Sequence, residues 1–305
     1  MAHPQKVRIV EVGPRDGLQN EKSVLETEDK FQYITLLKEA GLQTIEVTSF
    51  VKPPAIPQMR DAVELFTLVR DRLGLESTNF PCLVPNMYGY EKAKNLGVKE
   101  IALFTATSDS FTRKNVNASV DETFERMEEV AQAARKDGIR MRGYISTAFG
   151  CPYEGKIEVK KLIDVAERFL KLGVYEVSVG DTIGVAVPEQ VRSHLKDFLK
   201  AIPQEKAAMH FHDTRGMALT NILVSLEAGI SVFDSSSGGL GGCPYAKGAT
   251  GNVATEDVWY LLQSMGIETG IDIKKLSEAS AFILGKVQRT TESKFLRAYL
   301  NTGKI

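Results

Sequence analysis

Eight short apolar runs, separated by segments of helical periodicity, constrain the fold of this chain more than any other feature. The runs are rich in Val, Ile and Phe and nearly continuous, which is typical of strands buried on both faces. They span residues 7–13, 44–50, 77–84, 100–107, 140–147, 175–182, 207–213 and 231–239. This alternation predicts a parallel sheet with right-handed crossovers. Eight units within about 240 residues favour an α/β protein with a closed (β/α)8 TIM barrel over an open doubly wound sheet.

The segments between the runs carry the periodicity of amphipathic helices. The clearest of them cover residues 27–41, 119–138, 158–173, 188–202 and 217–229. In the second segment Ser119 and Glu122 have the spacing of a capping box, and Gly138 is the expected C-terminal residue. His194 lies in the charged segment 188–202, and we interpret it as a surface residue.

No linker rich in Pro, Ser or Gly divides the 305 residues, which predicts a single catalytic domain over 1–305. We expect the barrel to occupy about 7–265 and a helical extension to occupy about 266–305. Such an extension either caps one end of the barrel or packs on a partner, so we expect a homodimer with twofold symmetry.

The composition excludes several classes of partner. The chain has 38 Lys and Arg against 39 Asp and Glu, and this balance argues against a general nucleic-acid binder. No window approaches ~18 consecutive apolar residues, so a transmembrane protein is not expected. The odd number of cysteines, three, and a strand-like run that begins at Val7 predict a cytoplasmic, reducing location, expected in a bacterium, without a targeting peptide. An organelle protein given without its transit peptide is the alternative.

Polar residues stand where a barrel carries its chemistry, at the carboxyl ends of the strands. His210 and His212 end the seventh run two positions apart, so both rings point to one face and favour metal ligation; two solvent-facing rings are the alternative. Asp16 follows Arg15 in a Gly-flanked turn and offers a hard oxygen ligand, or is simply a turn residue. Because the first and seventh strands both face the mouth of a barrel, Asp16 can meet the two histidines.

The segment 238–251 contains six glycines in 14 residues and fits neither nucleotide-binding motif. It is interpreted either as a lid that closes over a substrate or as a flexible surface connection. Cys243 lies in its middle, where a core-filling role is not expected. Cys82, by contrast, lies inside the third run and is interpreted as a buried, inert thiol.

Acidic residues also interrupt or end the apolar runs. Glu46 lies in the second run, Asp181 ends the sixth together with Thr182, and Asp234 lies in the eighth. An acid within an apolar strand is costly unless it is paired. Glu46 therefore either pairs with Arg15 or orients a metal ligand.

Four segments together resemble the 3-hydroxy-3-methylglutaryl-CoA lyase family. They are EVGPRDGLQNEK (11–22), VTSFVKPPAIPQM (47–59), HFHDTRGMALTN (210–221) and GLGGCPYAKGATGNVATED (239–257). The resemblance runs from Val7 to about Leu300. The Arg-Asp turn and the His-x-His pair are shared with the wider metal-dependent aldol and Claisen superfamily, whereas the Cys-containing loop is specific to the lyases. One departure is Ser237-Gly238, where family members often have Val-Ala.

The resemblance implies a role for each matching residue. The implied metal ligands are Asp16, His210, His212 and Asn252. The implied catalytic residues are Arg15 at the thioester carbonyl, Cys243 as a thiol, and the acids Asp181 and Glu46 near the reacting carbons. Gln19, Lys22, Thr182 and again Arg15 are the implied contacts of the acyl-CoA substrate. Both Cys243 and Asp181 stand as candidates for the proton donor.

The activity that the resemblance implies is a carbon–carbon lyase reaction. The enzyme would cleave 3-hydroxy-3-methylglutaryl-CoA to acetyl-CoA and acetoacetate, a step of leucine degradation and ketone-body formation. Mixed oxygen and nitrogen ligands with places open to substrate suit Mg²⁺ or Mn²⁺ better than a closed zinc site. A condensing synthase or aldolase of the same superfamily would share the metal ligands, while a barrel without catalytic activity would leave the His pair and the Arg-Asp turn unexplained.

Overall fold

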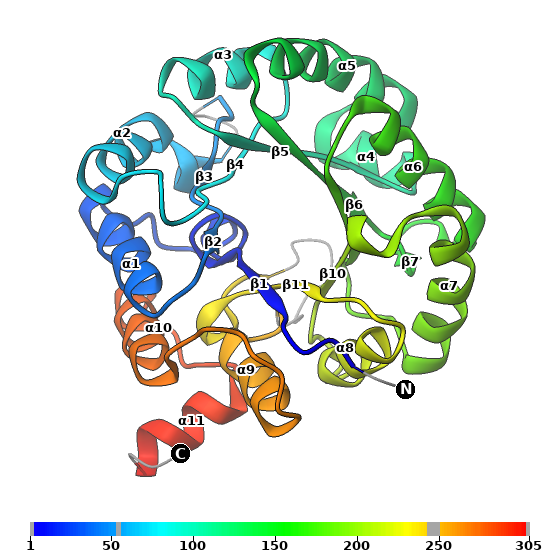
Figure 1. Cartoon of the computed structure of the whole chain (residues 1–305). Coiled ribbons are helices and arrows are strands. Elements are labelled where there is room, and N and C mark those ends of the chain that lie inside the picture. The colour runs from blue at the N-terminus through cyan, green and yellow to red at the C-terminus, as the bar shows by residue number, and fades with distance from the viewer. Residues whose placement is uncertain (1–2, 53–55, 243–250, 303–305) are drawn as a thin grey trace.

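The computed structural model describes residues 3–52, 56–242 and 251–302. It shows a ring of parallel strands surrounded by helices (Figure 1), and this confirms the TIM-barrel prediction. The barrel strands are β1 (Arg8–Glu11), β2 (Thr44–Ile45), β3 (Thr48–Ser49), β4 (Cys82–Leu83), β5 (Glu100–Ala106), β6 (Arg140–Ser146), β9 (Glu176–Asp181), β10 (Ala207–Phe211) and β11 (Val232–Ser235).

The sheet closes on itself through residues 44–49. The strand order is β2-β1-β11-β10-β9-β6-β5-β4-β3, so the two ends of the sheet are the two halves of one extended run. Between these halves, the Glu46 N–H donates to the Glu11 carbonyl at 2.9 Å and the Val47 N–H donates to the Pro81 carbonyl at 3.0 Å. Residues 44–49 therefore pair with β1 on one side and with β4 on the other. Counted as one strand, β2 and β3 together reduce the nine strands to the eight of a closed barrel.

Helices follow most strands and cover the outside of the ring (Figure 1). They are α1 (Thr27–Glu39), α2 (Ala62–Leu68), α3 (Met87–Asn95), α4 (Asp109–Val116), α5 (Val120–Asp137), α6 (Val159–Leu172), α7 (Pro188–Ala201), α8 (Ala218–Glu227), α9 (Thr255–Ser264), α10 (Ile273–Val287) and α11 (Lys294–Thr302). Short helical turns cover Gly13–Gly17, Pro57–Met59, Val69–Leu73, Gln204–Lys206 and Ser237–Gly239. In the described part of the chain, none of these helices has the length and apolarity needed to cross a membrane.

The predicted ends of α5 are confirmed. The Ser119 side chain accepts from the Glu122 N–H, and the Glu122 carboxylate accepts in return from the Ser119 N–H. At the other end Gly138 has φ of 69°, in the left-handed region that glycine adopts without strain. An N-terminal cap of this kind stabilises a helix by about 1 kcal/mol.

The apolar core lies between the strands and the outer helices. Strand residues such as Val177, Met209 and Phe233 belong to the same buried cluster as the inner faces of the helices. The opposite face of the strands points into the barrel and is partly charged. There Arg142 of β6 reaches Asp234 of β11 across two intervening strands.

His194 corrects the sequence interpretation, because it is buried rather than on the surface. Only 7% of it is exposed, and its ring lies 5.3 Å from the ring of Phe149. Burial lowers the pKa of His194. The buried residues Val191, His194, Leu195 and Phe198 follow the helical spacing of an apolar face, and this periodicity outweighs the charged neighbours.

A small hairpin was not predicted from the sequence. Strands β7 (Gly150–Cys151) and β8 (Gly155–Lys156) pair antiparallel after β6, outside the barrel sheet. Two-residue strands are too short to produce a periodic pattern, so alternation of side chains cannot reveal them.

The C-terminal extension is helical, as expected, and lies against the barrel's own helices. Helix α10 packs beside α1 (Figure 1), where Lys286 forms a 2.7 Å ion pair with Asp29. Helix α11 packs on α9 through Phe295, whose ring lies 5.6 Å from that of Trp259. The extension therefore covers the side of the barrel near the first strand.

Candidate active site

A single π-helical turn, Gly13–Gly17, carries Arg15 and Asp16 away from the end of β1. The Asp16 N–H donates to the Val12 carbonyl at 2.7 Å, which tightens the turn. Gly13 is required here, because a Cβ at this position would collide with the Tyr33 hydroxyl and lie 2.5 Å from Glu11 Oε1. The short turn holds both functional side chains directly at the barrel mouth.

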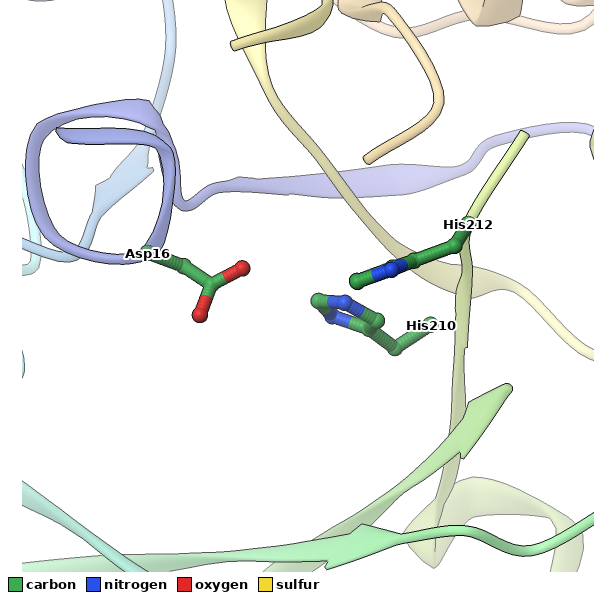
Figure 2. Close-up of side chains that lie close together, drawn as sticks. All are labelled: Asp16, His210 and His212. Atoms are coloured by element: carbon green, nitrogen blue, oxygen red, sulfur yellow. The ribbon is translucent and has the colours of Figure 1, made fainter. Parts of the chain in front are cut away.

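Asp16, His210 and His212 come together at this mouth. One ligand atom from each residue lies within 4.8 Å of those of the other two. Figure 2 shows the Asp16 carboxylate facing the two imidazoles, which come from the end of β10. The expectation that side chains of the first and seventh strand runs meet is therefore correct, and the group is a possible metal-binding site.

Asn252 lies beside the same group. Its Nδ2 donates to Asp16 Oδ2 at 2.9 Å and to the Leu240 carbonyl at 3.1 Å. The backbones of Asn252 and His212 form an isolated antiparallel bridge. The end of the Gly-rich segment is thus fastened next to the two histidines.

Two buried polar side-chain atoms at this group have no hydrogen-bond partner among the described residues. They are Nδ1 of His212 and Oδ1 of Asn252. Buried polar atoms are normally paired, so orphans of this kind require an explanation. A divalent cation would satisfy both, and the residues therefore fit such an ion in number and chemistry.

For Asp16 and His212, the surroundings favour the protonation states that a metal requires. Burial alone would raise the pKa of Asp16, but Arg15, His210 and His212 lower it to about 2. Burial and the neighbouring His210 lower the pKa of His212 to about 4. Asp16 is therefore ionised and His212 neutral near neutral pH.

Arg15 is held between two carboxylates. Its Nε donates to Glu46 Oε2 at 2.8 Å and its Nη1 donates to Asp16 Oδ1 at 2.7 Å. The guanidinium also lies 5.6 Å from the centre of the Tyr144 ring. Of the two interpretations of Glu46, pairing with Arg15 is confirmed, and the arginine in turn joins Glu46 to a candidate metal ligand.

Asp181 is the last residue of β9, the strand that pairs with β10, and Thr182 follows it. Burial raises the pKa of Asp181 to about 6, although its carboxylate accepts from the N–H groups of Val185 and Ala186 at 2.9 and 3.0 Å. The Thr182 hydroxyl accepts from the Thr147 N–H at 2.7 Å. Thr147 itself has φ of 59°, which is strained for a β-branched residue.

The remaining sequence candidates lie around the turn or outside the described residues. Gln19 is half-buried just after the π-helical turn, and Lys22 is exposed. Cys243 lies outside the described residues. Next to it in sequence, the Gly242 carbonyl accepts from Asn20 Nδ2 at 3.0 Å, so the Gly-rich loop contacts the segment that follows the π-helical turn.

Sequence reasoning missed the polar groups beneath the site. Arg142, Glu176 and Ser178 are buried inside the barrel, and they reach His210 through Asp234. The signal available was alternation. Arg142 and Tyr144, like Glu176 and Ser178, occupy every second position of an apolar run and so share the interior face.

Comparison with known proteins agrees with this geometry. The family model described as HMGL-like matches residues 6–283. The mitochondrial hydroxymethylglutaryl-CoA lyase of Rattus norvegicus is 51% identical over 295 residues, which are 97% of this chain and 90% of the relative. The crystal structure of hydroxymethylglutaryl-CoA lyase from Pseudomonas aeruginosa superimposes with a TM-score of 0.95 at 47% identity and covers 99% of both chains.

A further solved structure, an HMG-CoA lyase in complex with coenzyme A and 3-methylmalate, superimposes with a TM-score of 0.92 at 35% identity. It covers 100% of this chain and 99% of its own. These matches extend over the barrel, the candidate metal ligands and most of the C-terminal extension. The chain belongs to the hydroxymethylglutaryl-CoA lyase family.

Proposed function

We propose that this protein cleaves 3-hydroxy-3-methylglutaryl-CoA to acetyl-CoA and acetoacetate in a reaction that depends on a divalent metal ion. Family membership supports the carbon–carbon lyase reaction and the acyl-CoA substrate. The observation that carries the metal dependence is the meeting of Asp16, His210 and His212 beside Arg15. We propose that the enzyme acts in leucine degradation and ketone-body formation.

The residues that would hold the metal are Asp16, His210, His212 and Asn252, the last through its unpartnered Oδ1. One carboxylate, two imidazoles and one amide oxygen suit Mg²⁺ or Mn²⁺ with positions left for substrate oxygens. When bound, the ion acts as a Lewis acid that lowers the pKa of the substrate's tertiary hydroxyl.

Asp181 is the proposed base for that hydroxyl. With a pKa raised to about 6 it is largely ionised at neutral pH, yet basic enough to take a proton. As the electrons of the O–H bond form the C=O bond of the ketone, the bond between C2 and C3 breaks. The bonding electrons remain on C2 and give the thioester enolate of acetyl-CoA, while the other fragment is acetoacetate.

Arg15 is the proposed partner of the enolate oxygen. Its guanidinium is fixed by Glu46, so it needs no reorganisation as negative charge develops on the thioester. One well-placed donor of this kind typically contributes about 3–4 kcal/mol to the transition state. Gln19, Lys22 and Thr182 are the proposed further contacts of the acyl-CoA.

The enolate carbon must finally receive a proton to become acetyl-CoA. We assign this step to the Cys243 thiol, with Asp181 returning the hydroxyl proton as the alternative. A Cys243→Ser variant should lose activity by about 10²–10⁴-fold if the thiol is the acid. Activity near that of the unaltered enzyme, with metal binding intact, would assign the step to Asp181.

The direct test is to incubate the protein with 3-hydroxy-3-methylglutaryl-CoA and Mg²⁺ or Mn²⁺ and to identify the products. We expect acetyl-CoA and acetoacetate, no turnover in excess chelator, and recovery on adding metal. His212→Ala should lose metal binding, whereas Lys160→Ala, on an 84% exposed side chain of α6, should not. Full activity in chelator would refute the metal dependence, and condensation without cleavage would favour a synthase.

We also propose a homodimer. Tyr260 on α9 and Leu300 on α11 are each 55% exposed, and the two helices that carry these apolar side chains pack on one another. Sedimentation velocity should give twice the mass of the 33.6 kDa chain. A Tyr260→Asp, Leu300→Asp double variant should sediment as a monomer, and an unchanged dimer would exclude these two residues from the interface.

We place the enzyme in the cytoplasm. Cys82 and Cys151 are buried free thiols, which suits a reducing compartment. Cell fractionation with an antibody against the protein would test this location, and recovery from an extracytoplasmic fraction would contradict it.

A further inference from the structure

The barrel interior directly beneath the candidate metal site holds four buried polar side chains, Arg142, Glu176, Ser178 and Asp234, which we call the interior cluster. Each is at most 2% exposed. Arg142 donates through Nη2 to Asp234 Oδ1 at 2.7 Å and through Nε to Glu176 Oε1 at 2.7 Å. Asp234 and His210 join the cluster to the candidate metal site.

Asp234 Oδ2 receives three contacts. Ser178 Oγ donates to it at 2.6 Å, Arg142 Nη1 donates at 3.2 Å, and His210 Nδ1 lies 3.2 Å away. A carboxylate paired with a guanidinium is ionised and can only accept. The contact with His210 is therefore a hydrogen bond only when Nδ1 carries a proton.

A neutral imidazole with its proton on Nδ1 has its free electron pair on Nε2. That nitrogen is then the one left for the site shared with Asp16 and His212 (Figure 2). His212 offers a contrast, because its buried Nδ1 has no partner among the described residues. Within the part of the chain that the structure describes, a carboxylate contact orients the ring of His210, and no such contact is found for His212.

We propose that Asp234, braced by Arg142 and Ser178, is a positioning residue that fixes the tautomer of His210 and so prepares Nε2 as a metal ligand. This inference rests on the proposed metal dependence. Mutation of a carboxylate that orients a metal-binding histidine typically lowers metal affinity or activity by about 10–100-fold.

The substitution Asp234→Asn tests the proposal, because it replaces one of the two carboxylate oxygens by an amide donor. With its amide oxygen in the place of Oδ1, the asparagine keeps the shorter 2.7 Å contact with Arg142 Nη2 and gives up the longer 3.2 Å contact with Nη1. The amide nitrogen then takes the place of Oδ2 and donates to His210 Nδ1. The proton of His210 moves to Nε2, and the ligand atom is lost without any change in side-chain shape.

Glu176→Gln is the matched control. Glu176 also accepts from Arg142, so both variants remove one buried carboxylate from the same arginine, but Glu176 has no contact with His210. Mn²⁺ and Mg²⁺ dissociation constants should be measured by calorimetry on the unaltered protein and both variants, after circular dichroism has shown that each is folded. We expect about 10–100-fold weaker binding for Asp234→Asn and a change of less than about threefold for Glu176→Gln.

The tautomer is read independently of any metal from ¹⁵N-histidine spectra of the metal-free protein at alkaline pH. The chain has four histidines, so single His→Gln variants assign all the ring nitrogens. We expect the His210 proton on Nδ1 in the unaltered protein and on Nε2 in Asp234→Asn. This measurement needs only the unaltered protein if the Asn variant fails to fold.

A His210 proton on Nε2 in the unaltered protein would overturn the proposal. Equal losses of metal affinity in Asp234→Asn and Glu176→Gln would also overturn it, since the effect would then come from Arg142. Failure of the unaltered protein to bind either ion would refute the proposed metal dependence instead, and the nitrogen spectra would still decide the tautomer.

Discussion

Two groups of buried acids border the candidate site, and they are held in opposite ways. One is the interior cluster beneath His210. The other lies behind the π-helical turn and consists of Glu11, Tyr33, Thr255, Glu256 and Ser280, which we call the stem cluster. The acidic residues of both groups are at most 2% exposed, and both groups lie within one strand or turn of the candidate ligands.

The interior cluster contains a cation. Burial alone would raise the pKa of Asp234, but the Arg142 charge and the His210 hydrogen bond hold it well below its usual range. Asp234 therefore remains ionised throughout the physiological pH range. Removing one partner of such a buried ion pair strongly lowers the free energy of unfolding, because the other charge is left buried and unpaired. The intact pair itself adds little stability compared with apolar side chains of similar volume.

The stem cluster is held by hydrogen-bond donors, and among the described residues neither acid has an ion pair. Glu11 accepts from the N–H groups of Gly13 and Ser237 and from the Thr255 hydroxyl. Glu256 accepts from the Gly238 N–H at 3.0 Å and from Ser280 Oγ. Burial is the main cause that raises the pKa of Glu11 to about 7 and that of Glu256 to about 8.

The comparison teaches that a buried acid can position a site with or without its charge. Asp234 orients a ligand through a permanent charge. Glu11 joins Gly13 of the turn to Ser237 and Thr255, which flank the Gly-rich segment, and Glu256 holds Gly238 at the start of that segment. The pKa values of these two acids lie near neutral pH, so their charge changes there while that of Asp234 does not.

The largest expected effect comes from removing the cation of the interior cluster. Arg142→Met leaves Asp234 buried without its cation and leaves Glu176 with the partly exposed Arg8 alone, so the free energy of unfolding should fall by about 3–5 kcal/mol. Urea denaturation followed by circular dichroism measures it. Arg8→Met is the control, because Arg8 pairs with Glu176 from a side chain that is 31% exposed and should contribute at most about 1 kcal/mol. Equal losses in the two variants would remove the distinction.

The next effect is the pH dependence of stability due to Glu256. Its pKa is higher in the folded state than the ordinary value of 4.5, so between pH 4.5 and about 8 the folded chain holds more protons than the unfolded chain. The free energy of unfolding due to this group therefore falls as pH rises through that window, by up to ~1.4 kcal/mol per pH unit.

Glu256→Gln does not titrate, so its stability relative to the unaltered protein should rise across the same window and level off above pH 8. Urea denaturation at intervals between pH 5 and pH 9, about one unit apart, measures the difference. Parallel curves for the two proteins would show that Glu256 is ionised when folded, and the contrast between the clusters would fail.

A smaller effect is expected from Thr255→Val. The Thr255 hydroxyl donates to Glu11 Oε2 at 2.7 Å, and no other donor to that oxygen is found in the described residues. Its loss leaves a buried acceptor unsatisfied, at about 1–3 kcal/mol. Thermal unfolding measures the change, and a variant as stable as the unaltered protein would show that water or another donor replaces the threonine.

The smallest effect is expected from Ser178→Ala. Asp234 Oδ2 loses one donor but keeps Arg142 and His210, so the cost should be about 0.5–1.5 kcal/mol. The same thermal unfolding experiment applies. A loss larger than that of Thr255→Val would show that the hydroxyl, rather than the cation, fixes the carboxylate.

Much of the site could be predicted from local pattern. His210 and His212 share a face because alternate residues of a strand always do, and Asp16 and Asp181 stand at strand ends because apolar runs stop there. The strand–helix alternation then brings these ends to one mouth. Each step needs only short-range geometry and the rule for parallel crossovers.

Other parts required the order of the strands and the burial of each position. Arg142 and Asp234 lie 92 positions apart, and only the closed ring places them opposite one another. The burial of His194 depends on which face of α7 meets the barrel.

By itself, the sequence determined the eight strand–helix units, the turn with Arg15 and Asp16, and the paired histidines, because periodicity and local chemistry act over a few residues. The tertiary structure alone decided which acids are ionised, since a pKa depends on desolvation and on partners brought from distant strands. Asp234 pairs with a guanidinium across the barrel, while the partners of Glu11 and Glu256 among the described residues are uncharged donors. That difference in partners explains why the pKa of Asp234 is lowered while the pKa values of Glu11 and Glu256 are raised.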